Sequence, residues 1–544
     1  MIQPLSGQQR GWVDKTLDSL SVEQCIGQML NVSHSEEGAA YWLELYEQVP
    51  VGCMSARTAS AEAYRALLAE IQTRVPIPFL VLANMEHGAA EWPGYGTAYP
   101  WPMAAGAADD EALVRTMGEA IAAEARQIGV NWVLNPVIDL NYNADNPITN
   151  IRSMGDDPSR VSRLATAWIQ ALQAHGVAAT AKHFPGDGMD DRDQHLVSTV
   201  NTLPFQQWMR TYGRVWRAAI DAGVMTVMPG HISLPDYQGY ADCPEAAPPA
   251  TISRKLLIDL LRQELGFDGL IVSDSTSMVG LTSRVKPEER AVSAVAAGID
   301  VYLNADPERD FRLLVQAVRD GQLPEEQIRT SARRVLELKA QLNLHEAPLG
   351  PAPTSEQQAG FERAAQDMAD KSIVVLRTDG RPPVRLAAGA SVLTVTIGQL
   401  SPMRRQPDLD VFDEALRERG FQVEHLLNPN TRELLAAAQA HDAVFVHVYV
   451  MPFTTMGTVR VSGGGFGSWG WRSLFNEHSC VMYTAFGSPY VAYELPHVPN
   501  LIATFSDAPV SQRAAVKVWL GEMDARGTLP VHMPQATIRP LPVG

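Results

Sequence analysis

Short apolar runs recur along the first 305 residues, and stretches with helical periodicity separate them. We predict a strand from each run, because each is a block of apolar residues that gives way to polar, Gly or Pro positions. The eight predicted strands cover residues 25–33, 51–56, 79–84, 130–136, 176–182, 224–230, 269–275 and 299–304. One intervening helix is expected to start after Asp109 and Asp110, which suit an N-cap, and to end at Gly129.

Eight apolar strands that alternate with helices are typical of an α/β fold, the parallel (β/α)₈ TIM-like barrel. A doubly wound open sheet is the alternative, but no Gly-rich phosphate-binding motif follows the first strand. In such a barrel the functional groups lie at the carboxyl ends of the strands. Polar residues end six of the predicted strands: Asn84, Asn135, Lys182 with His183, His231, Asp274 and Asn304.

A second α/β pattern follows the barrel. We assign residues 1–345 to the barrel domain, 346–365 to a Pro-rich linker and 366–544 to a C-terminal α/β sandwich or doubly wound domain. The strands predicted for this C-terminal domain cover residues 372–377, 391–398, 442–450, 480–487 and 501–507. The Gly-rich stretch 461–471 is interpreted as a loop and not a phosphate site, because no strand-to-helix context surrounds it.

Composition narrows the classes of partner. Apolar residues make up 46% of the chain, and 44 Lys and Arg stand against 61 Asp and Glu, a net charge of −17. This excess of negative charge argues against nucleic acid or an anionic membrane as partner. The first residues lack the pattern of a signal peptide, and no run approaches the ~20 apolar residues of a membrane helix. The four cysteines are scattered, as expected for free thiols in a reducing compartment, so we expect a cytoplasmic protein.

Residues 181–196 concentrate two His, four Asp, one Lys and one Arg in sixteen positions. Lys182 and His183 end the fifth predicted strand, so we expect them at the mouth of the barrel. A cation next to a buried strand needs a partner. Lys182 is therefore expected to pair with Asp139, to donate to hydroxyl groups of a substrate, or to do both.

Asp193 precedes His195 by two residues, so its carboxylate can hold one imidazole nitrogen while the other nitrogen exchanges a proton. Asp274 ends the seventh predicted strand, where a desolvated carboxylate indicates a functional role. A carboxylate opposite a proton donor is the arrangement that cleaves glycosides by double displacement.

Four motifs together resemble glycoside hydrolase family 3: "KHFPG" (182–186), the Asp193-x-His195 pair, "RSMGDDP" (152–158) and "VSDSTSM" (272–278). The similarity is greatest to the bacterial β-N-acetylglucosaminidase branch, whose loop after strand five carries the Asp-x-His pair. By motif it spans about residues 80–305, and the two-domain layout extends it over nearly the whole chain.

The resemblance implies Asp274 as nucleophile, His195 as acid/base and Asp193 as the group that orients His195. It further implies that Arg152, Lys182 and His183 bind sugar hydroxyls and that His231 is a wall of the pocket. No metal or organic cofactor is implied. Most family 3 β-glucosidases take an acid/base Glu from the second domain. Because the Asp-x-His loop is present, we expect the second domain to shape the site instead.

One motif departs from the family. Where the family has Asp at the start of Asp-x-Glu-Gly-Gly, this chain has Asn84 in "ANMEHG" (83–88), with His87 in place of a Gly. The family's Asp accepts hydrogen bonds from two sugar hydroxyls, whereas Asn offers one acceptor oxygen and a donating NH₂ group. The hydrogen bonds to these hydroxyls must therefore be rearranged at Asn84.

The resemblance predicts a retaining exo-β-N-acetylhexosaminidase with a carbohydrate substrate. Two enzymatic alternatives stay open, a β-glucosidase or broader β-glycosidase and a glycoside phosphorylase. An alternative of another class is a sugar-binding protein without catalytic activity. The presence of Asp274, His195 and Asp193 together argues against it, because binding alone requires no nucleophile.

Overall fold

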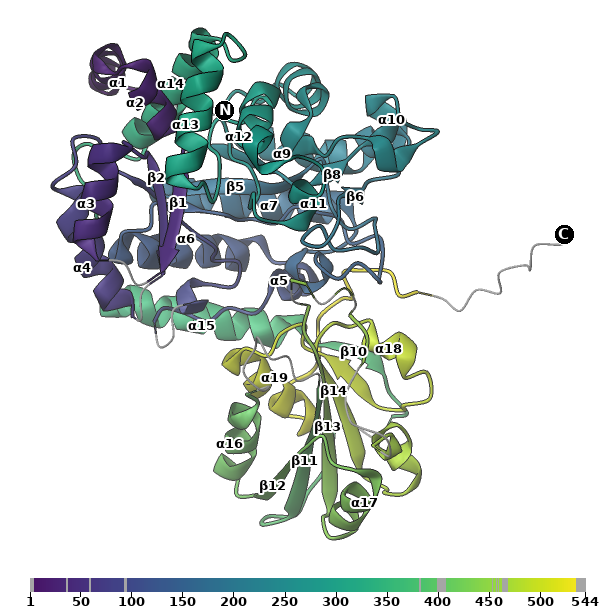
Figure 1. The fold of residues 1–544 in the computed structure, drawn as a ribbon. Coiled ribbons are helices and arrows are strands. Elements are labelled where there is room, and N and C mark those ends of the chain that lie inside the picture. Colours follow the sequence, from purple (N-terminus) through teal and green to yellow (C-terminus); the bar gives the residue numbers. More distant parts are fainter. Residues whose placement is uncertain are drawn as a thin grey trace, which may run out of the picture.

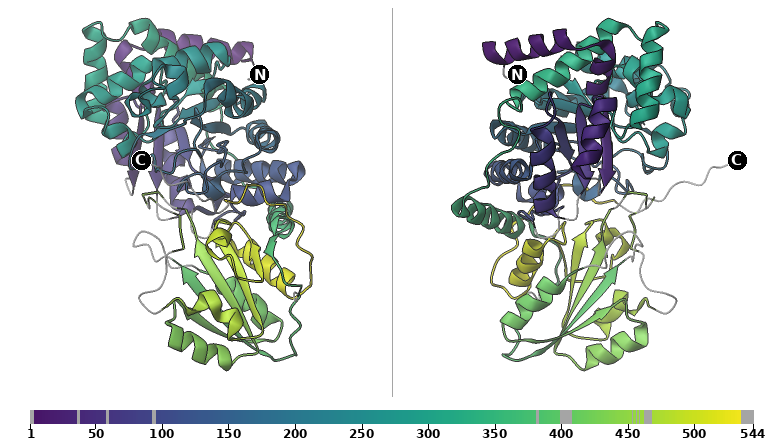
Figure 2. Two further views of the ribbon diagram at one scale, coloured as in Figure 1. Left: turned by 90° about the vertical axis from the view of Figure 1, so that its right-hand side faces the viewer. Right: turned by 60° about the vertical axis from the view of Figure 1, so that its left-hand side comes forward.

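The structure is a computed structural model of the 544-residue chain. It describes residues 4–35, 38–57, 60–91, 95–380, 383–398, 408–452, 454–455, 457, 459–461 and 468–534. An N-terminal barrel and a C-terminal α/β domain lie one above the other, with a long helix running across their boundary (Figure 1). Figure 2 shows the same two-part arrangement from two other sides.

The barrel is built on seven parallel strands in the order β1-β2-β3-β4-β5-β7-β9. Residues 301 and 302 close it, because Val301 bridges Val272 on one side and Tyr302 bridges Leu30 on the other. The predicted (β/α)₈ class is confirmed, although the eighth strand consists of these bridges alone. The strands are β1 (Asn31–Ser35), β2 (Cys53–Arg57), β3 (Leu80–Ala83), β4 (Trp132–Val133), β5 (Ala178–Phe184), β7 (Thr226–Pro229) and β9 (Leu270–Ile271).

The first predicted strand, residues 25–33, is wrong over most of its length. Residues 22–28 form helix α2 (Val22–Gln28), and the strand begins only at Asn31. The helix starts at a capping box, in which Ser21 and Gln24 satisfy each other's backbone N–H groups. This local capping outweighs the apolar character of the segment.

Helices surround the barrel, and helix α6 (Glu111–Ile128) has the predicted ends. Asp110 accepts from the backbone N–H groups of Ala112 and Leu113, and Gly129 ends the helix at a φ of 91°, which suits glycine. The others are α1 (Gly7–Ser19), α3 (Ala39–Gln48), α4 (Ala61–Gln72), α5 (Pro102–Ala108), α7 (Pro158–Ala174), α8 (Phe205–Arg210), α9 (Tyr212–Asp221), α10 (Pro235–Gln238), a π-helix (Lys255–Glu264), α11 (Val279–Thr282), α12 (Pro287–Ala297), α13 (Pro307–Arg319) and α14 (Glu325–Gln341).

Helix α15 (Ser355–Ser372) joins the two domains and occupies the second half of the segment predicted as a linker. It starts at Thr354, which forms a capping box with Gln357, so the polar sequence after the prolines is helical and not extended. The helix packs against α5 and α6 of the barrel and against α19 (Pro509–Trp519) of the second domain. The boundary between the domains is therefore a packed interface.

The C-terminal domain contains a six-stranded sheet in the order β10-β15-β14-β13-β11-β12. All pairs are parallel except β10 with β15. Strand β12, half-buried at the edge, was not predicted. The elements are β10 (Val374–Arg377), β11 (Ser391–Gly398), α16 (Asp410–Glu418), β12 (Gln422–Leu427), α17 (Thr431–Gln439), β13 (Ala443–Val450), β14 (Val481–Gly487), α18 (Val491–Glu494), β15 (Leu501–Ala503) and α19. The Gly-rich stretch lies mainly outside the described residues, at 462–467.

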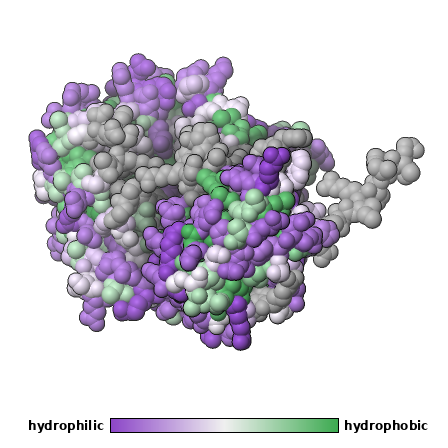
Figure 3. Space-filling model, turned by 90° about the horizontal axis from the view of Figure 1, so that it is seen from below, coloured by the Kyte–Doolittle hydropathy of each residue, from purple (hydrophilic) through white to green (hydrophobic). Residues whose placement is uncertain are grey.

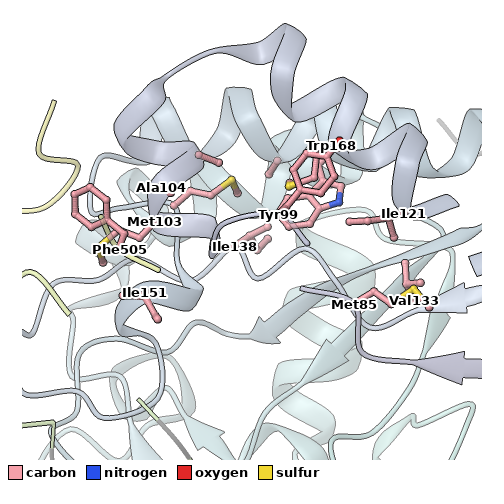
Figure 4. Close-up of a cluster of buried hydrophobic side chains, with 14 of the residues drawn as sticks. Met85, Tyr99, Met103, Ala104, Ile121, Val133, Ile138, Ile151, Trp168 and Phe505 are labelled. Atoms are coloured by element: carbon pink, nitrogen blue, oxygen red, sulfur yellow. The ribbon is translucent and has the colours of Figure 1, made fainter. Parts of the chain in front are cut away.

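The hydrophobic core crosses the domain boundary. Phe505, which follows β15, is buried and lies beside Met103 of α5 (Figure 4). In the same cluster, Met85 of the loop that follows β3 lies next to Val133 of β4. On the outer face seen from below, hydrophilic side chains cover most of the surface with smaller hydrophobic areas between them (Figure 3). The packing at residue 505 fixes the second domain over the mouth of the barrel.

Candidate active site

The predicted site residues lie at the carboxyl ends of the barrel strands or in the loops that follow them. Five of the strands and their following loops contribute, which brings together groups that are up to 190 positions apart in the sequence. The residues are Asn84 after β3, Arg152 in the loop after β4, Lys182 and His183 in β5, Asp193 and His195 after β5, His231 after β7 and Asp274 after β9.

Glu86 binds both predicted sugar-binding cations. Its carboxylate accepts from Arg152 Nε at 2.8 Å and Nη2 at 2.7 Å, and Lys182 Nζ lies 2.9 Å away. Burial by itself would raise the pKa of Glu86, but Arg152 and Lys182 hold that pKa well below its ordinary value. Burial by itself would lower the pKa of Arg152, and Glu86 raises it well above its ordinary value. Glu86 and Arg152 therefore stay charged inside the barrel mouth.

The sequence interpretation did not name Glu86 as a site residue. The signal was present, because Glu86 occupies the position of the Glu in the family's Asp-x-Glu-Gly-Gly motif. Two other residues at polar strand ends make contacts within the protein: the side-chain amide of Asn135 donates to the carbonyl of Met85 at 3.0 Å, and the backbone N–H of Asn304 donates to the side chain of Asn31.

The prediction that Lys182 pairs with Asp139 is wrong. Asp139 instead binds His183, with Oδ2 2.8 Å from the imidazole Nδ1 and Oδ1 accepting the backbone N–H of His183 at 3.1 Å. Lys182 Nζ instead pairs with Glu86, which is closer to it than any carboxylate oxygen of Asp139 that could form an ion pair among the described residues. Burial and the charge of Asp139 raise the pKa of the neighbouring Asp187 to about 7.

Asp193 and His195 make the contact that their spacing predicts. Asp193 Oδ1 lies 2.7 Å from His195 Nδ1 and accepts the backbone N–H of His195 at 2.8 Å. The side chain of Asp193 is fully buried, whereas that of His195 is 22% exposed. The imidazole is thus held by one nitrogen, and its exposed part faces the solvent side of the site. A group held in this way can transfer a proton through Nε2.

Asp274 is 9% exposed and lies three residues after the end of β9. Burial by itself would raise its pKa, but the charges of His183, His231 and His195 lower it. Its Oδ1 also accepts the backbone N–H of Ser275 at 2.7 Å. A carboxylate kept ionised and surrounded by three imidazoles is suited to act as a nucleophile.

His231 is completely buried behind Asp274. Its Nδ1 lies 2.9 Å from Thr251 Oγ1 and its Nε2 lies 2.9 Å from the carbonyl of Ser275, the residue after Asp274. Burial lowers the pKa of His231. Both ring nitrogens of His231 are thus engaged by the protein, and its role as a wall of the pocket stays a prediction.

Asn84 is exposed at the mouth and faces the cation network. Its Oδ1 accepts from Lys182 Nζ at 3.3 Å, so one of its two polar atoms points toward the Glu86 group.

Among the described residues, no group of three or more His, Cys, Asp or Glu could hold a metal ion. Over the same residues, we find no helix with the length and apolar character needed to cross a membrane.

This fold and site define the class of the protein as a glycoside hydrolase. The profile of the glycosyl hydrolase family 3 N-terminal domain matches residues 21–338, which is more than half of the chain. The chain belongs to glycosyl hydrolase family 3.

Two named relatives of this chain are glycosidases by name. The chain is 33% identical over 541 residues to a β-N-acetylglucosaminidase/β-glucosidase of Cellulomonas fimi, covering 96% of this chain and 95% of the relative. It is 29% identical to β-hexosaminidase A of Pseudoalteromonas piscicida over 287 residues, covering 49% of this chain and 48% of that one.

Solved structures share the complete two-domain layout. The β-glucoside phosphorylase BglX bound to 2FGlc superposes with a TM-score of 0.89 and is 29% identical, with 97% of each chain covered. A family 3 β-N-acetylglucosaminidase of Paenibacillus sp. strain FPU-7 superposes with a TM-score of 0.82 and is 26% identical, with 95% of this chain and 100% of the other covered.

Proposed function

We propose that the protein is a retaining exo-β-N-acetylhexosaminidase that removes terminal N-acetylglucosamine-type residues. The observation that carries the proposal is the pair formed by the ionised Asp274 and the Asp193–His195 dyad at one barrel mouth. Relatives named for N-acetylglucosaminide cleavage support the choice of sugar. Location in the cytoplasm stays a prediction from the sequence.

In the first step, a carboxylate oxygen of Asp274 attacks the anomeric carbon. The bond from that carbon to the leaving oxygen breaks, and His195 gives the leaving oxygen a proton. Asp193 holds Nδ1 of His195, so Nε2 is the nitrogen that carries this proton. In the second step, His195 takes a proton from water, which attacks the glycosyl–Asp274 ester and releases the sugar with retained configuration.

The cation network supports binding of the sugar at the same mouth. Glu86 accepts from Arg152 and Lys182, and the third proton of the Lys182 ammonium and the amide of Asn84 can serve sugar hydroxyls. His183, fixed by Asp139, presents Nε2 for another hydroxyl. Charged groups that are already held in place bind a polyol with little loss of side-chain entropy.

We propose phosphorolysis as a second candidate reaction of this site. In it, phosphate replaces water and attacks the glycosyl–Asp274 ester, which gives a glycosyl phosphate and frees the carboxylate. The full-length similarity to a β-glucoside phosphorylase favours this candidate. A further argument is that an imidazole acid/base, unlike a Glu, does not repel a phosphate dianion.

One experiment tests both candidates. The purified full chain is given a panel of aryl β-glycosides, N-acetylglucosaminide and glucoside, with and without inorganic phosphate. Free N-acetylglucosamine with unchanged rate in phosphate supports the hydrolase, and glycosyl phosphate as main product supports the phosphorylase. Preference for the glucoside by more than about tenfold would overturn the sugar assignment. Absence of turnover on every glycoside would overturn the enzymatic proposal.

A further inference from the structure

The second domain reaches the proposed acid/base. Asp193 has two carboxylate oxygens, and only Oδ1 is used by His195. The other oxygen, Oδ2, accepts the backbone N–H of Thr455 at 2.8 Å. Thr455 follows strand β13 of the C-terminal domain, 262 positions from Asp193 in the sequence. The fully buried carboxylate is therefore held by both domains at once.

Thr455 adopts a backbone conformation that a β-branched residue rarely takes. Its φ is 71°, in the left-handed region that favours glycine. Such a conformation persists only where the surroundings determine it, and it is found most often at functional sites. Here it accompanies the N–H that is directed at Asp193.

Contacts of the residues after Thr455 hold this part of the chain next to the loop of Asp193 and His195. Arg460 forms an ion pair with Asp145 of the barrel. Val461 N–H donates to Glu494 at 3.0 Å, which ties the segment to its own domain. A Cβ placed on Gly457 would lie 3.9 Å from the side chain of Leu196, the residue after His195, so the two loops lie close together. The contact of Thr455 is thus part of a docked segment.

We propose that Thr455 positions the acid/base, with its N–H holding Asp193 so that His195 is aligned for proton transfer, and that Gly457, Arg460 and Val461 keep Thr455 in place. This inference rests on the proposed function, in which His195 is the acid. A buried carboxylate with one oxygen free could rotate and take His195 with it, and a donor on the second oxygen prevents this. The second domain would then assist acid catalysis through its backbone without supplying the acid.

The test compares two substitutions that remove the same side chain. Thr455→Gly keeps the N–H and tolerates a φ of 71°, whereas Thr455→Pro removes the N–H and excludes this φ. We measure kcat/KM, which reports the glycosylation step, on a dinitrophenyl glycoside and on the phenyl glycoside of the preferred sugar. Unsubstituted phenol needs a proton in order to leave, whereas dinitrophenol leaves as the anion.

Thr455→Pro should lower kcat/KM on the phenyl glycoside about tenfold and on the dinitrophenyl glycoside less than about twofold, the size expected for one hydrogen bond to a charged group. The loss on the phenyl glycoside should be at least about five times that of Thr455→Gly. Equal losses on both leaving groups, or equal losses in both variants, would overturn the proposal.

Arg460→Gln provides an independent variant that keeps Thr455, for the case in which Thr455→Pro does not fold. It removes the ion pair with Asp145, and we expect a loss of about threefold, again confined to the phenyl glycoside. Arg333→Gln is its matched control, because Arg333 pairs with Asp14 at similar exposure but at the opposite end of the barrel, and no loss is expected. A loss of equal size in Arg333→Gln, or none in Arg460→Gln, would count against the proposal.

His195→Ala is measured in parallel to separate two kinds of failure. If His195→Ala discriminates strongly between the leaving groups and the variants at 455 and 460 do not, the positioning role is overturned and the proposed function stands. If His195→Ala does not discriminate either, the assignment of the acid is at fault.

Discussion

Glu86 and Arg152 face each other through two hydrogen bonds, of 2.8 and 2.7 Å, although 66 positions separate them in the sequence. Lys182 completes the group at 2.9 Å from the same carboxylate. The arrangement places one negative charge between two positive ones inside the barrel mouth, with side chains at most 17% exposed. A charge group of this kind is stable only while its members remain together.

Glu86→Gln should destabilise the fold, because it leaves Arg152 and Lys182 buried without their counter-charge. We expect a loss of about 3–5 kcal/mol in the free energy of unfolding near neutral pH, measured by urea denaturation. Glu70→Gln is the matched control, because Glu70 forms an exposed pair with Arg74, where a loss below about 1 kcal/mol is expected.

A comparison of wild type with Glu86→Gln also tests how the stability contributed by Glu86, Arg152 and Lys182 depends on pH. The folded-state pKa of Glu86 lies well below its ordinary value of 4.5. Between these two pKa values, the unfolded chain therefore binds more protons than the folded chain does. The ionised Glu86 carboxylate contributes its full share of the stability above the pKa that Glu86 has in the unfolded chain. This share is lost as the pH falls through the pKa that Glu86 has in the folded protein. The stability gap between wild type and Glu86→Gln should therefore be constant from about pH 8 to 5.5 and shrink below about 4.5. A gap independent of pH down to about 3 would contradict the ion network.

Asp274→Ala should abolish turnover while the protein stays folded. The substitution removes the proposed nucleophile, and we expect kcat to fall by at least about a thousandfold. The variant should keep a cooperative unfolding transition, which separates loss of catalysis from loss of the fold. Activity close to that of the wild type in a folded variant would disprove the assignment.

His195→Ala should lower the rate more than Asp193→Ala, since Asp193 acts only through the imidazole that it holds. On a phenyl glycoside we expect His195→Ala to lose about 10²–10⁴-fold, as is usual for a general acid. On an activated substrate, breakdown of the glycosyl–Asp274 ester becomes limiting, and added azide should restore the rate and yield a β-glycosyl azide. Without azide rescue, and with an unaltered pH profile, the acid/base role would belong to another residue.

Asn84→Asp should change sugar preference and preserve the fold, because the side chains are nearly isosteric and the position is exposed. The new carboxylate would gain acceptor capacity beside Lys182, which now donates to Asn84 at 3.3 Å. We expect the ratio of kcat/KM for N-acetylglucosaminide over glucoside to shift several-fold, on the order of 1–2 kcal/mol. A ratio that does not move across the aryl glycoside panel would show that Asn84 does not contact the sugar.

Local sequence features were enough to predict much of the architecture. Apolar runs located the barrel strands within a few residues, since each buried parallel strand must be apolar on both faces. The caps of α6, at Asp110 and Gly129, were also readable, because capping is decided within one helical turn. Two helical segments were not predicted, helix α2 and the first half of α15. Each begins at a capping box, but the residues around it are apolar in the first case and Pro-rich in the second, and these favoured a strand and a linker.

The sequence by itself determined the strand ends that carry the chemistry and the Asp193–His195 contact, because two residues that lie two positions apart need only a local bend to meet. Tertiary structure alone decided that Lys182 pairs with Glu86 and not with Asp139, and that Thr455 of the second domain completes Asp193. The physical reason is that a buried charge takes the partner that barrel closure and domain packing bring within hydrogen-bonding distance, and separation along the chain carries no information about that distance.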